Sequence, residues 1–178
     1  MSTLKVPISS SDHVEGNATA ACTLVEYGDY QCPHCGRAYP IVKRIQKHFG
    51  DRLRFVFRNF PLNEIHPEAE SAAEASEYAA AHGKFWQMHD ALFENQVNLG
   101  LGIYQEFAKE LGLDPAALRD ALKLGKFRER VRADFNGGVR SGVNGTPTFF
   151  INGQRHDNSF DFETLSETIE AAMGSNET

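Results

Sequence analysis

The chain has 178 residues, of which 41% are hydrophobic and 24% charged, and its formal net charge is −6 at pH 7. This length and composition are typical of one globular domain with a real core. The acidic balance argues against nucleic acid or an anionic membrane as the main partner. No apolar run approaches the roughly 20 residues that span a bilayer, so no membrane segment is expected.

The N-terminus, MSTLKVPISSSDH, lacks a basic start followed by an apolar stretch, so it is not a secretory signal as it stands. It predicts a cytoplasmic location, or a periplasmic one if a signal segment has been removed. The first twenty or so residues are polar and are expected to be irregular, and the last five are expected to be frayed.

The first predicted strand is residues 23–27, TLVEY, which are rich in strand formers. Apolar residues then recur at helical spacing as far as Phe49, and Gly50 can end that helix. A second, largely buried strand is predicted over residues 53–58. Strand, helix and strand in this order predict a βαβ unit with parallel strands and a right-handed crossover.

A helical block follows the second strand. Asp114 and Pro115 start one of its helices with a cap and a proline at the first helical position. A β-hairpin turning at Asn152-Gly153 then gives the sheet an antiparallel part, so an α/β fold with a mixed sheet is predicted. The helices are predicted at residues 68–82, about 85–93, 103–111, 115–124, 126–140 and 161–173, and the hairpin strands at 148–151 and 154–156. The basic run at 123–132 is interpreted as a solvated helix face, with docking of an acidic partner as the alternative.

The sequence YQCPHCGR places two of the three cysteines within one helical turn. The thiolate is the nucleophile in disulfide exchange. Cys32 is expected at a helix N-terminus, where backbone N–H groups and the helix dipole favour the anion. Pro33 suits the first helical position, and His34 can add a positive or hydrogen-bonding partner. These effects predict a lowered pKa for Cys32, a buried resolving thiol at Cys35 and an oxidising couple.

Other interpretations of the cysteines remain open. A zinc site needs a second pair of ligands, and the sequence offers no other CxxC and no histidines at ligand spacing, so no metal is predicted. Cys22 is expected to be a small buried residue, with a regulatory thiol as the alternative. His89 is expected to be a hydrogen-bonded core histidine, or else a groove contact near the active site. His66 is expected to help start a helix.

A second motif, GTPTFF, places a Thr-Pro bond just before a strand. An X-Pro bond can be cis at modest cost. A cis Thr146-Pro147 bond would expose the Thr146 backbone, with which an extended substrate could pair as an added strand. The alternative is an ordinary loop proline.

The order of CPHC and GTPTFFINGQ, with a helical block between them, resembles the DsbA-like branch of the thioredoxin superfamily from about residue 21 to residue 172. The resemblance is nearest to a cytoplasmic bacterial subgroup. It implies a single domain over residues 1–178, with the thioredoxin core at about 21–62 and 126–173. The helical insertion would be at about 63–125.

The resemblance also implies roles for individual residues. Cys32 would be the attacking cysteine and Cys35 the resolving one. Thr146-Pro147 would be the cis-proline loop packed against their sulfurs. Glu26, six residues before Cys32, would be a buried proton acceptor for Cys35, although an exposed edge residue is the alternative. Two further residues, Tyr30 and Gln31, are expected to line the substrate surface.

The function that follows is thiol–disulfide exchange in either direction, with no cofactor beyond the Cys32–Cys35 disulfide. The expected partners are protein or peptide thiols and disulfides, with glutathione as a further candidate. A monomer is the default, because no dimerisation segment is evident. The alternative function is a non-catalytic metal-binding or chaperone-like module with the same fold.

Overall fold

The structure is a computed structural model that describes residues 2–174. It divides into two compact units. The sheet unit comprises Met1–Gly28, Arg37–Arg58 and Gly137–Thr178, and the helical unit comprises Asp29–Gly36 and Asn59–Asn136. The predicted fraying of the last five residues falls mainly on 175–178, which lie outside the described residues.

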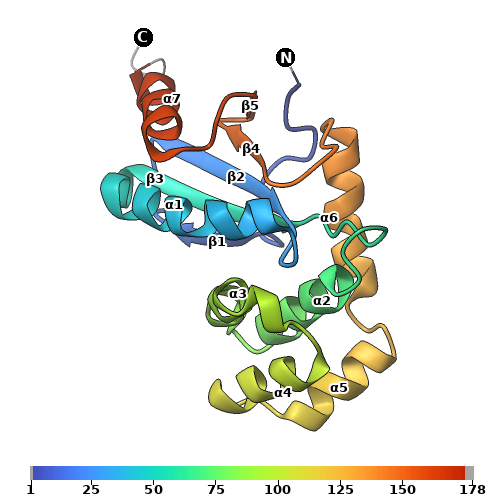
Figure 1. Cartoon of the computed structure of the whole chain (residues 1–178). Helices are drawn as coiled ribbons and strands as arrows, with labels where there is room; N and C mark the ends of the chain where they lie inside the picture. The colour runs from blue at the N-terminus through green and yellow to red at the C-terminus, as the bar shows by residue number, and fades with distance from the viewer. Residues whose placement is uncertain (1, 175–178) are drawn as a thin grey trace. The chain divides into compact units, whose positions relative to one another are not determined.

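The sheet unit is built on a five-stranded sheet with the order β1-β3-β2-β4-β5 (Figure 1). Strand β1 pairs antiparallel with β3, β2 with β4, and β4 with β5. Strands β2 and β3 are adjacent and are joined through α1, Pro33–Phe49, which confirms the predicted α/β fold with a mixed sheet. The strands are β1 His13–Gly16, β2 Cys22–Gly28, β3 Leu53–Asn59, β4 Thr148–Ile151 and β5 Gln154–His156.

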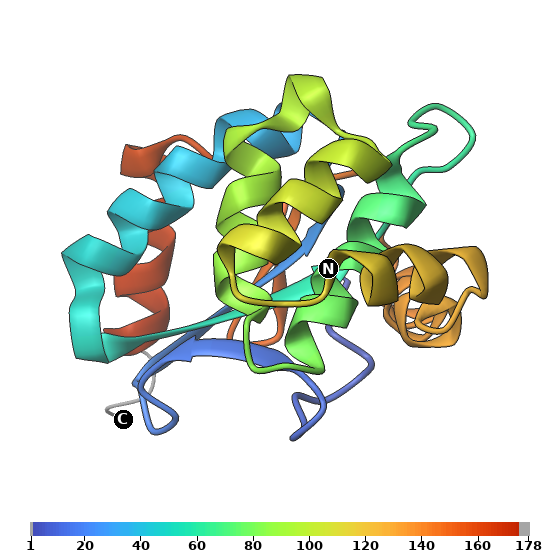
Figure 2. The ribbon, with the colours of Figure 1, turned by 90° about the horizontal axis from the view of Figure 1, so that it is seen from below.

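The neighbouring inner strands β2 and β4 are buried along their whole length. Their near-continuous apolar sequence suits strands that are covered on both faces. Helix α7, Phe162–Gly174, lies beside α1, and both views show the two helices next to each other (Figures 1 and 2). The Arg44 guanidinium of α1 lies over the Phe162 ring, 4.2 Å from its centroid.

The expectation of an irregular N-terminal region is wrong in part, because His13–Gly16 form the edge strand β1. The segment before this strand is held by the buried guanidinium of Arg58. This group makes two bonds to the Asp12 carboxylate, at 2.8 and 2.9 Å, and donates to the carbonyls of Val6 and Pro7 at 3.0 and 3.1 Å. Asp12 and Arg58 are 46 positions apart in the sequence. A four-residue strand that depends on so distant a contact leaves little local signal in the sequence.

The helical unit confirms most predicted helices to within a few residues. Asp114 Oδ1 accepts hydrogen bonds from the N–H groups of Ala116 and Ala117, at 2.9 and 3.2 Å, so the predicted cap is present. The elements are α2 Ala69–Ala80, α3 Phe85–Glu94, α4 Leu101–Glu110, α5 Pro115–Lys123 and α6 Arg128–Arg140, with short 3-10 helices at Gln96–Asn98 (η2) and, in the sheet unit, Gly50–Arg52 (η1). Within residues 2–174, no helix combines the length and apolarity needed to cross a membrane.

The basic run at 123–132 is more than a solvated helix face. Arg128 lies 3.7 Å from carboxylate oxygens of both Glu70 and Glu74 in α2. Arg130 Nε lies 3.9 Å from a carboxylate oxygen of Glu77, which is also in α2. Arg128 and Arg130 of α6 therefore pair with carboxylates of α2 inside the helical unit.

Candidate active site

Cys32 is the last residue before α1, and Cys35 lies one turn inside that helix. Their side chains are buried, with exposed fractions of 3% and 0%, and both are free thiols. The Cys32 N–H donates to the Asp29 carbonyl at 3.1 Å, which closes a tight turn before the helix. The N–H of Asp29 points back to the Cys35 sulfur, at 3.5 Å. The turn before α1 therefore positions Cys32 at the start of the helix and also places the Asp29 N–H against the Cys35 sulfur.

The carboxylate of Asp29 organises this turn from within. Oδ1 accepts the Gln31 N–H at 2.8 Å, and Oδ2 accepts the Leu62 N–H at 3.0 Å. His66 Nδ1 donates to the same Oδ2 at 2.7 Å. A buried carboxylate needs such donors, because it has lost its water. Asp29 therefore ties the cysteine turn to the loop that follows β3, and it gives His66 a contact beyond the predicted helix start.

Gln96, in η2, holds the same turn from the other side. Its Nε2 donates to the carbonyls of Tyr30 and Cys32, at 2.9 and 2.7 Å. A Cβ at Gly36 would overlap Gln96 Oε1, so only glycine fits there without moving the amide. Sequence reasoning missed both Asp29 and Gln96, since neither carries a motif.

Tyr30 corrects one prediction about the substrate surface. Its side chain is fully buried, its hydroxyl hydrogen-bonds with His89 Nδ1 at 3.0 Å, and its ring packs on Phe93 with centroids 4.8 Å apart. The ring therefore fills the core of the helical unit. His89 is the hydrogen-bonded core histidine that the sequence predicted. Gln31 is half-buried, and its Oε1 accepts the Glu68 N–H at the start of α2, at 2.6 Å.

The remaining predicted site residues divide between the units. Pro33 and His34 are exposed on the first turn of α1. Glu26 is buried in β2 of the sheet unit, opposite Phe149 of β4. The Thr146-Pro147 peptide bond is cis and leads directly into β4. Glu26 therefore lies on the strand that pairs with β4, and the cis bond lies directly before the first residue of β4.

Cys22, the third cysteine, opens β2 and is fully buried, as predicted for a small core residue. Burial raises the pKa of its thiol from 9.0 to about 11. Among the residues that the structure describes, no group of three or more His, Cys, Asp or Glu side chains is placed to hold a metal ion.

Comparison with known protein families identifies the family to which the chain belongs. A family profile described as Thioredoxin matches residues 9–171, so the chain belongs to the thioredoxin family. BdbD from Bacillus subtilis, in its oxidised crystal structure, superposes with a TM-score of 0.87 and 29% identity, over 97% of this chain and 98% of that one. A thioredoxin-like oxidoreductase from Silicibacter pomeroyi DSS-3 gives 0.81 and 25% identity, over 93% and 94%.

The DsbA-like resemblance is confirmed at the level of the fold. Wolbachia pipientis alpha-DsbA1 superposes with a TM-score of 0.81 at 21% identity, over 97% of this chain and 95% of that one. The fold is that of DsbA-like oxidoreductases.

The curated relatives correct the predicted location. A protein named Na(+)/H(+) antiporter NhaA 1, from Salinispora arenicola (strain CNS-205), is 42% identical over 171 residues, which are 96% of this chain and 26% of that protein. The chain thus spans about a quarter of the length of the curated relatives that it matches. The expectation of a cytoplasmic location, and of a cytoplasmic subgroup, is wrong, because these relatives are named as Na(+)/H(+) antiporters.

Proposed function

We propose that the protein is a thiol–disulfide oxidoreductase whose redox centre is the Cys32–Cys35 pair. The observation that carries the proposal is the position of Cys32 at the N-terminus of α1, with Cys35 one turn on and an N–H of the preceding turn on its sulfur. Backbone N–H groups and the positive end of the helix dipole favour a thiolate at such a place.

In the oxidising direction, a substrate thiolate attacks the Cys32 sulfur of the disulfide form. The Cys32–Cys35 bond breaks, and Cys35 leaves as a thiolate. A second substrate thiolate then attacks the substrate sulfur of the mixed disulfide and releases Cys32. The substrate has lost two electrons and two protons, and the protein pair has gained them. In the reducing direction the same bonds are exchanged in reverse, with Cys32 attacking the substrate disulfide and Cys35 resolving it.

The other predicted residues receive roles on this basis. Pro33 starts the helix without an N–H to satisfy, and the exposed His34 can approach a reacting substrate. Glu26 is proposed as the proton acceptor for Cys35. The backbone beside the cis Thr146-Pro147 bond is proposed as the edge on which an extended substrate pairs.

The proposed partners are protein or peptide thiols and disulfides, with glutathione as a small-thiol alternative and a monomer as the working state. The chain is proposed to be one thioredoxin domain with a helical insertion at about 63–125, which lies inside the helical unit.

The test is a pair of cysteine variants followed by mass spectrometry. Cys32→Ser should abolish exchange with a peptide disulfide, whereas Cys35→Ser should accumulate a mixed disulfide at Cys32. Retained exchange in Cys32→Ser would reject the proposal. Titration of the Cys32–Cys35 couple against glutathione buffers then gives the direction. A potential near or above roughly −150 mV indicates an oxidant, and one near roughly −250 mV or below indicates a reductase.

A further inference from the structure

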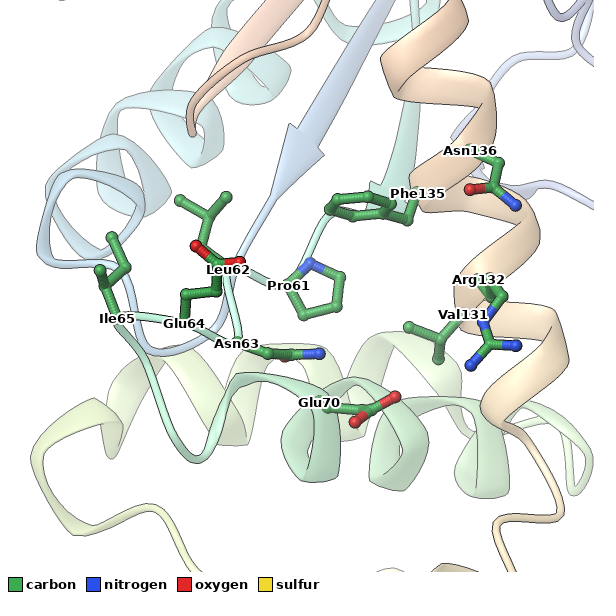
Figure 3. Close-up of a pocket in the computed structure, with 10 residues that line it drawn as sticks. All are labelled: Pro61, Leu62, Asn63, Glu64, Ile65, Glu70, Val131, Arg132, Phe135 and Asn136. Carbon is green, nitrogen blue, oxygen red and sulfur yellow. The ribbon is translucent and has the colours of Figure 1, made fainter.

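His66 lies in the loop that joins β3 to α2, directly after residues 61–65, which line a pocket of about 580 Å³ in the helical unit (Figure 3). Its side chain is 16% exposed, and the Asp29 carboxylate that it contacts is fully buried. The thiol chemistry proposed above gives neither side chain a role. Their contact joins this loop to the turn before Cys32, within one compact unit.

The histidine is the donor in this contact. His66 Nδ1 lies 2.7 Å from Asp29 Oδ2, and the same oxygen accepts the Leu62 N–H at 3.0 Å. The other carboxylate oxygen accepts the Gln31 N–H at 2.8 Å. These donors suit an ionised carboxylate, which needs hydrogen bonds in place of the water it has lost. Asp29 is therefore the anion of the pair, and His66 keeps a proton on Nδ1 whether or not its ring is charged.

The backbone of Asp29 contacts both cysteines. Its N–H lies 3.5 Å from the Cys35 sulfur, and its carbonyl accepts the Cys32 N–H at 3.1 Å. A donor on a sulfur stabilises the thiolate more than the thiol, because hydrogen bonds to an ion are the stronger ones. The placement of Asp29 therefore affects the sulfur that must carry negative charge when the Cys32–Cys35 bond breaks.

The carboxylate of Asp29 acts on that sulfur in the opposite sense. A negative charge close to a buried thiol disfavours the thiolate. The His66 N–H offsets part of this charge and fixes the carboxylate in one orientation. His66 thus holds the N–H of Asp29 in place and reduces the unfavourable effect of the Asp29 charge.

We propose that His66 is a positioning residue for disulfide exchange, which acts through Asp29 to stabilise the Cys35 thiolate. The inference rests on the proposed function and adds to it the control of one step. When a substrate thiolate forms its bond to the Cys32 sulfur, the Cys32–Cys35 bond breaks and its electron pair passes to the Cys35 sulfur. A sulfur whose thiolate is more stable leaves faster, so the contact between His66 and Asp29 accelerates this step.

Two substitutions isolate the hydrogen bond. The Nδ2 of an asparagine takes the place of a histidine Nδ1, since both atoms are bonded to Cγ, so His66→Asn keeps a donor to Asp29. His66→Leu keeps a similar volume and has no donor. His82→Leu is the matched control in the helical unit, because His82 Nδ1 hydrogen-bonds with the Tyr78 carbonyl at 2.9 Å.

Two rate constants are measured for each protein. The first is for reduction of the disulfide form by dithiothreitol, a reaction in which Cys35 leaves as a thiolate. It should fall about three- to tenfold in His66→Leu and stay within about twofold of the wild type in His66→Asn and His82→Leu. The second is for attack of Cys32 on 2-hydroxyethyl disulfide in a Cys35→Ser background, where Cys35 takes no part. This rate constant should be equal with and without each substitution.

Circular dichroism first shows that each variant is folded, and His66→Ala replaces His66→Leu, with the same expected loss, if the leucine variant does not fold. An unchanged reduction rate in the variant without a donor, or an equal loss in His66→Asn, would overturn the role of the hydrogen bond. An equal loss in the Cys32 reaction would reveal a general loosening of the turn and would overturn that role as well. If Cys32 does not attack 2-hydroxyethyl disulfide even beside an intact His66, the proposed function fails instead, and the role of His66 with it.

Discussion

Gln96 Nε2 lies 2.7 Å from the main-chain oxygen of Cys32, so a residue 64 positions further along the chain holds the start of α1. The same amide nitrogen donates to the Tyr30 carbonyl at 2.9 Å. Both carbonyls belong to the turn that presents the cysteine. A carbonyl that loses its donor in a buried place costs about 1–3 kcal/mol.

Gln96→Leu removes this amide while keeping a side chain of similar size. We expect the free energy of unfolding to fall by about 1–3 kcal/mol, because the Tyr30 and Cys32 carbonyls each lose one donor, and the Cys32 carbonyl keeps the Gly36 N–H at 3.0 Å. The turn also becomes less ordered, so the effective concentration of Cys35 at Cys32 should fall. The equilibrium constant for forming the disulfide from glutathione should then fall about three- to tenfold. Redox titration in glutathione buffers measures this constant.

Gln105→Leu is the matched control, because Gln105 Nε2 also donates to a main-chain carbonyl, that of Pro115, at 3.2 Å. This contact joins α4 to α5, outside the cysteine turn. The control should lose some stability and keep the wild-type redox equilibrium. An equal shift of the redox equilibrium in both variants would show that general destabilisation, not positioning by Gln96, is responsible.

Gly36→Ala should act through the same amide. The added Cβ would overlap Gln96 Oε1, so the Gln96 side chain must leave its two carbonyls. We expect the variant to lose stability, although Ala favours a helix over Gly by about 1 kcal/mol. In a Gln96→Ala background the overlap is gone, and the same substitution should stabilise the protein. Urea unfolding of the four proteins in this cycle tests the change of sign, and effects that add within about 0.5 kcal/mol would refute it.

The elements that the sequence predicted correctly depend on local information. The Asp114 cap, the cysteine pair at a helix start and the hairpin at Asn152-Gly153 each involve residues a few positions apart. The hairpin residues take positive φ values of 46° and 80°, as its turn type requires. Asn and Gly are the residues that tolerate this conformation most easily.

The residues that sequence reasoning missed act over long separations. Asp29 meets Leu62 33 positions away and His66 37 positions away. Its position directly before the cysteine predicts Tyr30 at the substrate surface, but its side chain is buried against partners as distant as His89, 59 positions away. Arg58 occupies a polar position in its strand, and that pattern cannot distinguish an arginine that faces water from one that anchors a distant segment.

Arg58→Lys tests that anchor. The guanidinium forms two bonds to the Asp12 carboxylate, and it also donates to Tyr27 Oη at 2.9 Å. An ammonium group is a point charge and cannot reproduce this planar fork. We expect the free energy of unfolding to fall by about 2–4 kcal/mol, because the Asp12 carboxylate stays buried with fewer donors.

Arg54→Lys is the control for this substitution in the same strand. The Arg54 Nε donates to Thr23 Oγ1 at 3.0 Å in a partly exposed setting, so the change should cost less than about 1 kcal/mol. Both values come from urea unfolding followed by circular dichroism. Similar losses in the two variants would mean that Arg58 is not a special anchor of the N-terminal segment.

The buried thiol of Cys22 should make the free energy of unfolding depend on pH in the alkaline range. Burial raises the pKa of its thiol from 9.0 to about 11, so the folded protein resists forming the thiolate. With a folded pKa above the unfolded one, the contribution of this group is fully present below about pH 9 and is lost as the pH rises through 11. Between these two pKa values the free energy of unfolding falls by about 1.4 kcal/mol for each pH unit, so the neutral Cys22 thiol contributes roughly 2–3 kcal/mol in total.

Cys22→Ala removes this titration. The free energy of unfolding of the wild type minus that of the variant should be constant from pH 7 to about 8.5. It should then fall as the pH approaches 11, because only the wild type loses the contribution of the Cys22 thiol. The buried tyrosines titrate in both proteins and cancel in the comparison, and guanidinium unfolding at each pH supplies the two free energies. Because the neutral thiol reacts poorly, Cys22 should also resist iodoacetamide at pH 8 in the folded protein. A difference that stays constant up to pH 11 would mean that the Cys22 thiol is not desolvated in the folded state.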